Sequence, residues 1–331
     1  MRFRRMRSAP FWLTLLTLLA GCGKPQPLVT ENFEIYLSRK NDIPLKLAEL
    51  IEGAKKEVLL TSFEADLPCI FAALKAAQDR GVKVKLLVDD KAAESAPALP
   101  FNFISTDSNP SSLMHAKFGV VDEKVAWLGS FNLTFGSAYQ SDNDLVFFRS
   151  PETAGYLRRV FNSLSVGQKP PASFSGDPKI PIQIYLNPKC HTVILKELNS
   201  AQKEIFFSHY AFTDTEIIRV LQEKSERGLK ISGVLEKDLA VNDTAFRELN
   251  ASGINTAWDK NYYLNHYKLF LIDGKKIITG SYNPSKAARR NQEIILVIEN
   301  PEAVRFYKRN LTHIFAKGTP KDTPFNHTFP R

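Results

Sequence analysis

The feature that most constrains this chain is an internal repeat, in which short stretches recur about 147 residues apart. Residues 54–58 (AKKEV) match residues 201–205 (AQKEI), and residues 80–84 (RGVKV) match residues 227–231 (RGLKI). The offset drifts only between 147 and 151, so the copies differ by insertions of a few residues. The repeat predicts two similar halves of roughly 150 residues, packed as a pseudo-twofold pair, with a site shared across their interface.

Hydrophobic periodicity within each copy indicates alternating strands and helices. In the first copy, apolar residues follow helical spacing over residues 45–51 and again over 70–80, where Gly81 ends the run. Residues 57–62 are β-prone, and residues 82–88 alternate before becoming wholly apolar, as a strand entering a buried sheet does. The sequence therefore predicts an α/β fold in which each half is a mixed β-sheet flanked by helices.

The repeat also sets the expected boundaries of the chain. Residues 169–179 are rich in proline, serine and glycine, which is typical of a linker between halves. The predicted segments are a signal peptide (1–21), a flexible spacer (22–31), a first half (32–168), a linker (169–180), a second half (181–317) and a C-terminal tail (318–331).

The N-terminus resembles the signal of a bacterial lipoprotein. Basic residues precede an apolar run of about ten residues, half of what a spanning helix needs, and the run ends in Leu19-Ala-Gly-Cys22. The resemblance implies that Cys22 is acylated and anchors the protein to the bacterial cell envelope. Gly23, rather than aspartate, after the cysteine implies the outer membrane in a Gram-negative cell. The alternative is an ordinary secretory signal with an incidental cysteine.

Charge and cysteine content constrain the rest of the chain less. The net charge is +9, but residues 1–21 carry four basic residues and no acidic one, which leaves 40 basic and 35 acidic residues, or +5. A mildly basic chain suits anionic partners, either phospholipid surfaces or nucleic acid. In an extracytoplasmic compartment, Cys69 and Cys190 could form a disulfide or remain two buried free thiols.

The strongest functional signal lies late in each copy, where the pattern His-x-Lys-x4-Asp-x6-Gly-Ser-x-Asn occurs at identical spacing. Its members are His115, Lys117, Asp122, Ser130 and Asn132 in the first copy, and His266, Lys268, Asp273, Ser281 and Asn283 in the second. Two such patterns in register are not plausibly accidental. With this signature the chain resembles the phospholipase D superfamily of phosphodiesterases, over essentially all of its length after the signal.

Strand geometry favours a phosphate site at this pattern. Residues i and i+2 of a strand project from one face, so His115 and Lys117 point together, as do their counterparts in the second copy. Hydroxyl, amide and ammonium groups all donate hydrogen bonds to phosphate oxygens. The residues expected to bind phosphate in this way are Ser130, Asn132, Ser281 and Asn283. We expect no metal and no cofactor, because the sequence shows no cluster of metal ligands and the lysines discourage a cation.

The resemblance also implies roles for individual residues. One neutral imidazole attacks phosphorus to form a phosphohistidine, while the other protonates the leaving oxygen and then activates water or an alcohol. By family analogy His115 is the nucleophile and His266 the acid/base. The other residues assigned to the catalytic set are Lys117, Lys268, Asp122 and Asp273, of which the two aspartates are expected to brace their hairpins. An acid before the next strand orients each histidine, and aligning the copies assigns this to Asp144 and Glu293.

The sequence leaves the substrate open between three alternatives. A lipid anchor favours a phospholipid phosphodiesterase or phosphatidyltransferase, working as a monomer with both half-sites in one chain. Compact halves without large inserted lids, and the mild basic charge, favour a nuclease of the same superfamily. A non-catalytic phosphate-binding module is the third alternative, against which the complete sets of histidine, lysine and asparagine in both halves argue.

The lipoprotein hypothesis can be tested at Cys22. If this cysteine is acylated, the protein fractionates with membranes, and Cys22→Ser releases it or blocks its processing. Cell fractionation, followed by mass spectrometry of the N-terminal peptide, measures both effects. Soluble, unlipidated wild-type protein in the envelope of the native host would contradict the hypothesis.

Overall fold

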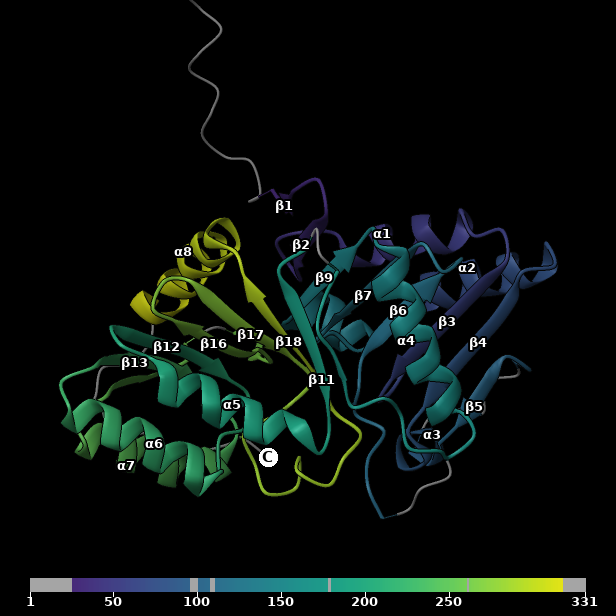
Figure 1. Ribbon diagram of the computed structural model, residues 1–331. Helices are drawn as coiled ribbons and strands as arrows, with labels where there is room; N and C mark the ends of the chain where they lie inside the picture. The colour runs from purple at the N-terminus through teal and green to yellow at the C-terminus, as the bar shows by residue number, and fades with distance from the viewer. Residues whose placement is uncertain (1–25, 96–100, 108–110, 178–179, 261, 318–331) are drawn as a thin grey trace, which may run out of the picture.

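Two β-sheets form the centre of the molecule, one in each half of the chain (Figure 1). The computed structural model describes residues 26–95, 101–107, 111–177, 180–260 and 262–317. Cys22, the predicted signal peptide and the predicted tail therefore lie outside the described residues. In Figure 1 the first half, purple to teal, stands at the right, and the second half, teal through green to yellow, stands at the left.

The first half alternates strands and helices as the periodicity predicted. Its elements are β1 (Leu28–Val29), β2 (Phe33–Leu37), α1 (Ile43–Glu52), β3 (Glu57–Ser62), α2 (Pro68–Asp79), β4 (Lys83–Val88), α3 (Asp90–Ser95), β5 (Ile104–Thr106), β6 (Phe118–Val121), β7 (Val125–Gly129), the short π-helix η1 (Gly136–Gln140), β8 (Ser141–Asp142), β9 (Asp144–Phe148) and α4 (Pro151–Leu164).

The second half repeats this order with small changes. Its elements are β10 (Ser173–Phe174), β11 (Ile182–Leu186), α5 (Lys189–Ser200), β12 (Glu204–His209), α6 (Thr215–Glu226), β13 (Lys230–Leu235), the 3₁₀-helix η2 (Ala240–Asn242), α7 (Asp243–Ala251), β14 (Asn255–Trp258), β15 (Leu264–Asn265), β16 (Lys268–Ile272), β17 (Lys276–Gly280), β18 (Ile294–Glu299) and α8 (Pro301–Lys317).

The two sheets have the same topology. The strand order is β1-β2-β9-β7-β6-β3-β4-β5 in the first and β10-β11-β18-β17-β16-β12-β13-β14 in the second, so each strand has a counterpart at the same place. The three strands at one edge of each sheet run parallel, β3-β4-β5 and β12-β13-β14, and the remaining pairs are antiparallel. The predicted α/β fold, with two similar halves and a mixed sheet in each, is confirmed.

Each central strand is buried on both faces, which explains the continuous apolar runs in the sequence. In β9, Val146 and Phe148 face a core shared by both halves, whereas Leu145 and Phe147 face a core that the first half forms alone. The shared core includes residues of both sheets together with α4 and α8, and the two outer cores contain α1 and α2 in one half and α5, α6 and α7 in the other. The shared core therefore holds the two halves as one unit.

The structure differs from the sequence-based boundaries at two places. Leu28–Val29, in the expected spacer, adds β1 to the edge of the first sheet, and Ser173–Phe174, in the expected linker, adds β10 to the same edge of the second. Cys69 is exposed and Cys190 is buried, and both are free thiols. Within the described residues, no helix is both long enough and apolar enough to cross a bilayer.

The glycine that precedes each Ser-x-Asn segment permits a close approach between strands. A Cβ atom on Gly129 would lie 2.2 Å from the carbonyl oxygen of Asp144, and one on Gly280 would lie 2.3 Å from that of Ile294. Gly280 also has a φ of 139°, which side chains rarely adopt. The repeated glycine therefore lets β7 pack closely against the start of β9, and β17 against the start of β18, where each Ser-x-Asn segment begins.

We predict that Gly129→Ala lowers the free energy of unfolding by about 1–3 kcal/mol, because the new methyl group overlaps backbone that cannot move aside. Gly155→Ala is the matched control: its Cβ would meet nothing closer than Arg159 at 3.7 Å, and it lies within helix α4. That change should raise stability by about 1 kcal/mol. Urea unfolding of both variants measures the difference. A Gly129→Ala protein as stable as the wild type would contradict the close approach.

Candidate active site

In each half, the segment that precedes the histidine pairs with backbone of the other half. β15 pairs in parallel with β8 of the first half, and the backbone N–H of His266 donates to the carbonyl of Asp142 at 3.0 Å. In the pseudo-symmetric position Met114 forms a bridge with Gln292, and the N–H of His115 donates to the carbonyl of Gln292 at 3.0 Å. Each histidine is thus held by backbone of the opposite half.

The imidazole rings are oriented across the same interface. Nδ1 of His115 lies 3.0 Å from a carboxylate oxygen of Glu293, and Nδ1 of His266 lies 2.7 Å from the amide oxygen of Asn143. An acceptor at Nδ1 places the proton there and leaves the lone pair on Nε2. Both rings therefore have a defined tautomer with Nε2 available for chemistry.

Asn143, and not Asp144, is the counterpart of Glu293. The backbone N–H of Ser38 donates to the carbonyl of Asn143, and that of Asn187 donates to the carbonyl of Glu293, so both residues occupy the position just before the strand. The sequence alignment that paired Asp144 with Glu293 is out of register by one residue, because it matched acid with acid. In a strand, one residue of shift moves a side chain to the other face.

The carboxylate of Asp144 instead ties the first half to the second. It accepts hydrogen bonds from the hydroxyl of Thr279 in β17, at 2.7 Å, and from the hydroxyl of Tyr307 in α8. The residue is fully buried, and burial raises the pKa of its carboxyl above the usual value. Asp144 therefore contributes to the shared core and does not touch a histidine.

The serines of the two motifs form hydrogen bonds with the residues that orient the histidines. The hydroxyl of Ser130 donates to the amide oxygen of Asn143 at 3.1 Å, and the hydroxyl of Ser281 donates to the carboxylate of Glu293. Each hydroxyl also accepts a backbone N–H from the strand that follows it, and both serines are fully buried. Contrary to the sequence-based assignment, Ser130 and Ser281 are committed to bracing the histidine-orienting groups and not to phosphate.

The lysines fold back over the histidine backbone. Nζ of Lys117 donates to the carbonyl of His115 at 2.6 Å, and Nζ of Lys268 donates to the carbonyl of His266 at 2.8 Å. Both lysines are buried, at 1% and 3% exposure. The i, i+2 spacing that placed each lysine beside its histidine is therefore realised in both halves.

Sequence reasoning missed an aromatic residue in each half-site. Phe63 meets the ring of His115 edge-on at 5.6 Å between centroids, and Tyr210 meets that of His266 at 4.9 Å. The ammonium of the neighbouring lysine lies over the same ring, 5.6 Å from Phe63 and 5.2 Å from Tyr210. Both aromatics directly follow the equivalent strands β3 and β12 and are 147 residues apart, so the repeat offset carried the signal.

Burial dominates the electrostatics of the site. It lowers the pKa of Lys117 to about 7 and holds that of Lys268 well below its usual range. Burial lowers the pKa of His115, with Glu293 opposing the shift, and lowers that of His266 further, helped by the charges of the lysines. A bound anion would reverse these shifts, since it stabilises the cationic forms. The electrostatics of the site therefore favour an anionic ligand.

The motif asparagines remain available to a ligand. Asn132 and Asn283 follow the braced serines by two residues, and the buried amide oxygen of each has no hydrogen-bond partner among the described residues. Amide groups at a phosphate site normally donate through nitrogen, and the orientation of the amide plane is set by whatever binds there. The prediction that both asparagines contact phosphate is consistent with these open positions.

The motif aspartates lie away from this site. Asp122 directly follows β6 and Asp273 directly follows β16, at the ends of these strands that are remote from the histidines. Asp122 accepts hydrogen bonds from the backbone N–H groups of residues 55–57, and Asp273 does the same with residues 202–204. Seven residues of extended chain separate each from its histidine, roughly 20 Å. Their place in the catalytic set therefore has no geometric support, whereas bracing of the hairpins does.

A carboxylate in each half fixes the residue before the histidine, and sequence reasoning missed both. Asp89 accepts the backbone N–H of Met114 at 2.7 Å, and Glu236 accepts that of Asn265 at 2.5 Å. Asp89 directly follows β4 and Glu236 directly follows β13, and the two positions are again 147 residues apart. These contacts hold the exchanged segments against their own sheets.

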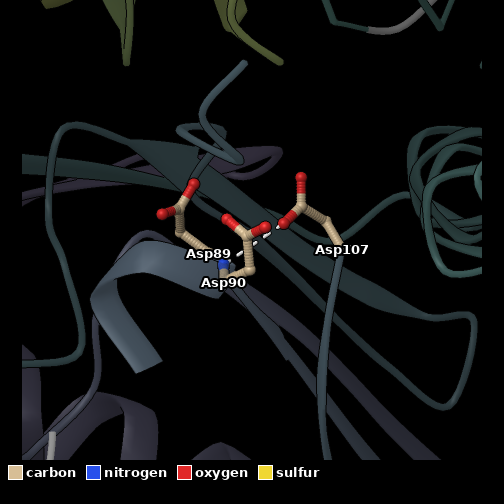
Figure 2. A group of neighbouring side chains, drawn as sticks. All are labelled: Asp89, Asp90 and Asp107. Carbon is tan, nitrogen blue, oxygen red and sulfur yellow. Dashed lines mark hydrogen bonds between the residues drawn. The ribbon is translucent and has the colours of Figure 1, made fainter. Parts of the chain in front are cut away.

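Asp89 also belongs to a group of three acids. Its carboxylate and those of Asp90 and Asp107 lie within 4.8 Å of one another, as Figure 2 shows. Burial raises the pKa of Asp107 to about 6, and its carboxylate accepts the N–H of Asp90. Because Asp89 is already satisfied by the N–H groups of Met114 and of residues 91 and 92, we assign no ligand to this group.

Comparison with known proteins agrees with the two-part layout. The family model described as "Cardiolipin synthase, PLD-like domain" matches residues 47–165 and 194–315, one match in each half. A solved phosphatidylserine synthase of Haemophilus influenzae Rd KW20 has the same fold, with a TM-score of 0.68 at 14% identity over 84% of this chain and 86% of that one.

Sequence relatives match a shorter stretch. A phospholipase D of Rickettsia conorii is 32% identical over 123 residues, which is 37% of this chain and 62% of the relative. A mitochondrial cardiolipin hydrolase of Mus musculus is 27% identical over 134 residues, 40% of this chain and 61% of the relative. The chain thus spans about three fifths of the length of these relatives. Because the family model covers both halves, together with their paired histidines and lysines, the chain belongs to the phospholipase D superfamily.

Proposed function

We propose that this protein cleaves phospholipid phosphodiesters through a phosphohistidine intermediate, and that it can pass the phosphatidyl group to water or an alcohol. The observation that carries the proposal is the reciprocal orientation of the two rings: each Nδ1 is bonded across the interface, to Glu293 or to Asn143. Both Nε2 atoms are left free by these bonds, and His266 lies close enough to His115, Lys117 and Lys268 for their charges to lower its pKa, which supports one shared site.

In the first step, Nε2 of His115 attacks phosphorus, and the bond from phosphorus to the headgroup oxygen breaks. The protonated ring of His266 gives its Nε2 proton to that oxygen, so the headgroup leaves as an alcohol. We assign His115 as the nucleophile because its ring becomes positive on bonding phosphorus, and the carboxylate of Glu293 stabilises that charge. Lys117 and Lys268 stabilise the negative charge on the phosphoryl oxygens.

In the second step, the now neutral His266 removes a proton from water, whose oxygen attacks the phosphorus. The bond between phosphorus and His115 then breaks, which releases phosphatidic acid and restores both rings. An alcohol in place of water would give a transferred phosphatidyl group. The amide of Asn143 holds His266 in place during both proton transfers without adding charge.

The choice of lipid as substrate rests on independent indications. The relatives named above are a phospholipase D and a cardiolipin hydrolase, and the structural neighbour is a phosphatidylserine synthase. The expected acyl anchor at Cys22 would hold the site at a membrane. Nucleic acid shares the phosphodiester chemistry, so single-stranded DNA is the comparison substrate in the test.

We predict that His115→Ala and His266→Ala each lower the turnover of labelled phosphatidylglycerol by about two to four decades, and that the double variant is hardly worse. Residues that act in one turnover are strongly non-additive, whereas independent sites would leave half the activity in each single variant. The assay contains excess chelator, in which wild-type activity should persist. Quenching in alkali, which preserves the acid-labile bond between phosphorus and the imidazole nitrogen, followed by peptide mapping identifies the modified residue; the phosphatidyl group on His266 would reverse the roles.

Wild-type protein that cleaves single-stranded DNA but no phospholipid would overturn the choice of substrate and keep the mechanism. A single variant that retains half of the wild-type turnover would overturn the shared site.

The register correction gives a second prediction. Asn143→Ala removes the acceptor from Nδ1 of His266 and should lower turnover at least tenfold, because the ring loses its defined tautomer. Asp144→Asn, one residue along, should keep turnover within about threefold, since Asp144 contacts Thr279 and Tyr307 and not the ring. Initial rates measure both, and thermal unfolding checks that each variant is folded. The opposite ranking would support the acid-to-acid alignment.

A further inference from the structure

Exposed apolar side chains gather at one rim of the molecule. In the described part of the chain, nine large hydrophobic side chains are exposed, and five of them belong to two short segments. These five, which we call the aromatic rim, are Phe135, Tyr139, Tyr262, Tyr263 and Leu264. Tyr262 is 92% exposed and Phe135 is 51% exposed. A cluster of exposed apolar side chains is unfavourable on a face that stays in water, and it is typical of an interaction surface.

The exchange between the halves brings these segments together. β8 and β15 pair directly, so the residues before β8 and before β15 lie side by side. The rings of Phe135 and Tyr139 lie 4.9 Å apart, and those of Tyr262 and Tyr263 lie 5.2 Å apart. Tyr139 and Tyr263 line one hollow of about 330 Å³, where the guanidinium of Arg39 lies 4.4 Å from the ring of Tyr263.

The rim adjoins the catalytic residues. Leu264 precedes His266 by two residues, and Tyr139 precedes Asn143, the acceptor for His266, by four. The site residues themselves are buried, whereas the rim is exposed. A surface that bound the rim would therefore lie next to the shared phosphate site.

The fold does not require aromatic residues here. Residues 133–140 of the first half read LTFGSAYQ, and the corresponding residues 284–291 of the second read PSKAARRN. Lys286 and Arg290 are exposed in that second segment, and Arg290 lines a hollow of about 380 Å³ together with Lys169. Equivalent segments of the two halves therefore present an aromatic surface on one side of the site and a basic surface on the other.

We propose that the aromatic rim docks the protein on an anionic phospholipid bilayer, with its rings in the interfacial layer and the basic segment toward the headgroups. Tyrosine and phenylalanine suit this layer because their rings are apolar and the tyrosine hydroxyl stays hydrated. Basic residues beside them add attraction to anionic lipids. This docking rests on the proposed function, since it explains how a buried site meets a lipid phosphodiester.

The path of the N-terminal chain supports a bilayer as the occupant. β1 is antiparallel to β2, with Leu28 opposite Ile35, so the chain before Leu28 leads toward the end of β2, where Arg39 contacts Tyr263. Cys22 is six residues before Leu28, at most about 20 Å of extended chain. A lipid on Cys22 and the aromatic rim could therefore contact the same membrane.

The test measures vesicle binding and soluble catalysis on the same proteins. Every sample is the full chain with Cys22→Ser, so that no acyl chain contributes and residues 1–21 contribute equally. Phe135→Ser/Tyr262→Ser removes the two most exposed rings of the rim. We expect co-sedimentation with vesicles of phosphatidylglycerol and phosphatidylethanolamine to weaken at least about tenfold. Hydrolysis of bis(p-nitrophenyl) phosphate, a soluble phosphodiester, should stay within about twofold.

Matched controls separate the rim from general surface effects. Phe135→Trp/Tyr262→Trp keeps large rings at both positions and should bind vesicles as the Cys22→Ser protein without rim substitutions does. Val166→Ser removes another exposed apolar side chain, 65% exposed beyond the end of α4, and should change neither readout.

Unchanged vesicle binding by Phe135→Ser/Tyr262→Ser would overturn the docking proposal. So would a loss of soluble hydrolysis as large as the loss of vesicle binding. A variant that loses binding to single-stranded DNA while its vesicle binding is unchanged would also overturn it. Vesicle binding that depends on the rim, in a wild-type protein that cleaves no phospholipid, would support the docking surface and reject lipid hydrolysis.

Discussion

The active site depends on one reciprocal interaction: each half of the chain supplies the hydrogen-bond acceptor that orients the histidine of the other half. Glu293 holds His115 and Asn143 holds His266, and Ser281 and Ser130 brace those acceptors in turn. The pairing of β8 with β15 and the shared core keep the halves in the register that this exchange requires. Neither half alone contains an oriented histidine, so the geometry of the site is a property of the interface.

This arrangement concentrates basic groups where burial disfavours their charge. Both lysines and both histidines have lowered pKa values in the absence of an anion, and burial is the largest cause for each. Carbonyl acceptors and aromatic faces compensate the ammonium groups only in part. In the proposed reaction, the phosphodiester would supply the compensating negative charge, and that charge would grow on the phosphoryl oxygens in the transition state, so the stabilisation would increase along the reaction.

The repeat was enough to predict two mixed sheets, and strand spacing was enough to place each lysine beside its histidine, because both follow from local periodicity. The orienting residues were harder to predict. Choosing between Asn143 and Asp144 needs the register of β9 against β2, and a carboxylate looks the better partner until that register is known. The hydrogen bonds of the serines, and the bonds by which each half orients the other's histidine, could not be predicted from the sequence either. They depend on which segments of the two halves lie together. Phe63 and Tyr210 carried a signal in the 147-residue offset, but aromatic residues at strand ends are common in cores.

Covalent fusion of the halves has a consequence for how the two half-sites can differ. A dimer of identical halves would place the same residue at both orienting positions, and the same segment on both sides of the phosphate, because a twofold axis repeats every substitution. Here the orienting pair is a carboxylate and an amide, and the flanking segments are aromatic on one side and basic on the other. A single chain can thus give its two imidazoles unequal proton affinities, and it can offer the proposed lipid substrate one wall for its acyl region and a different wall for its headgroup.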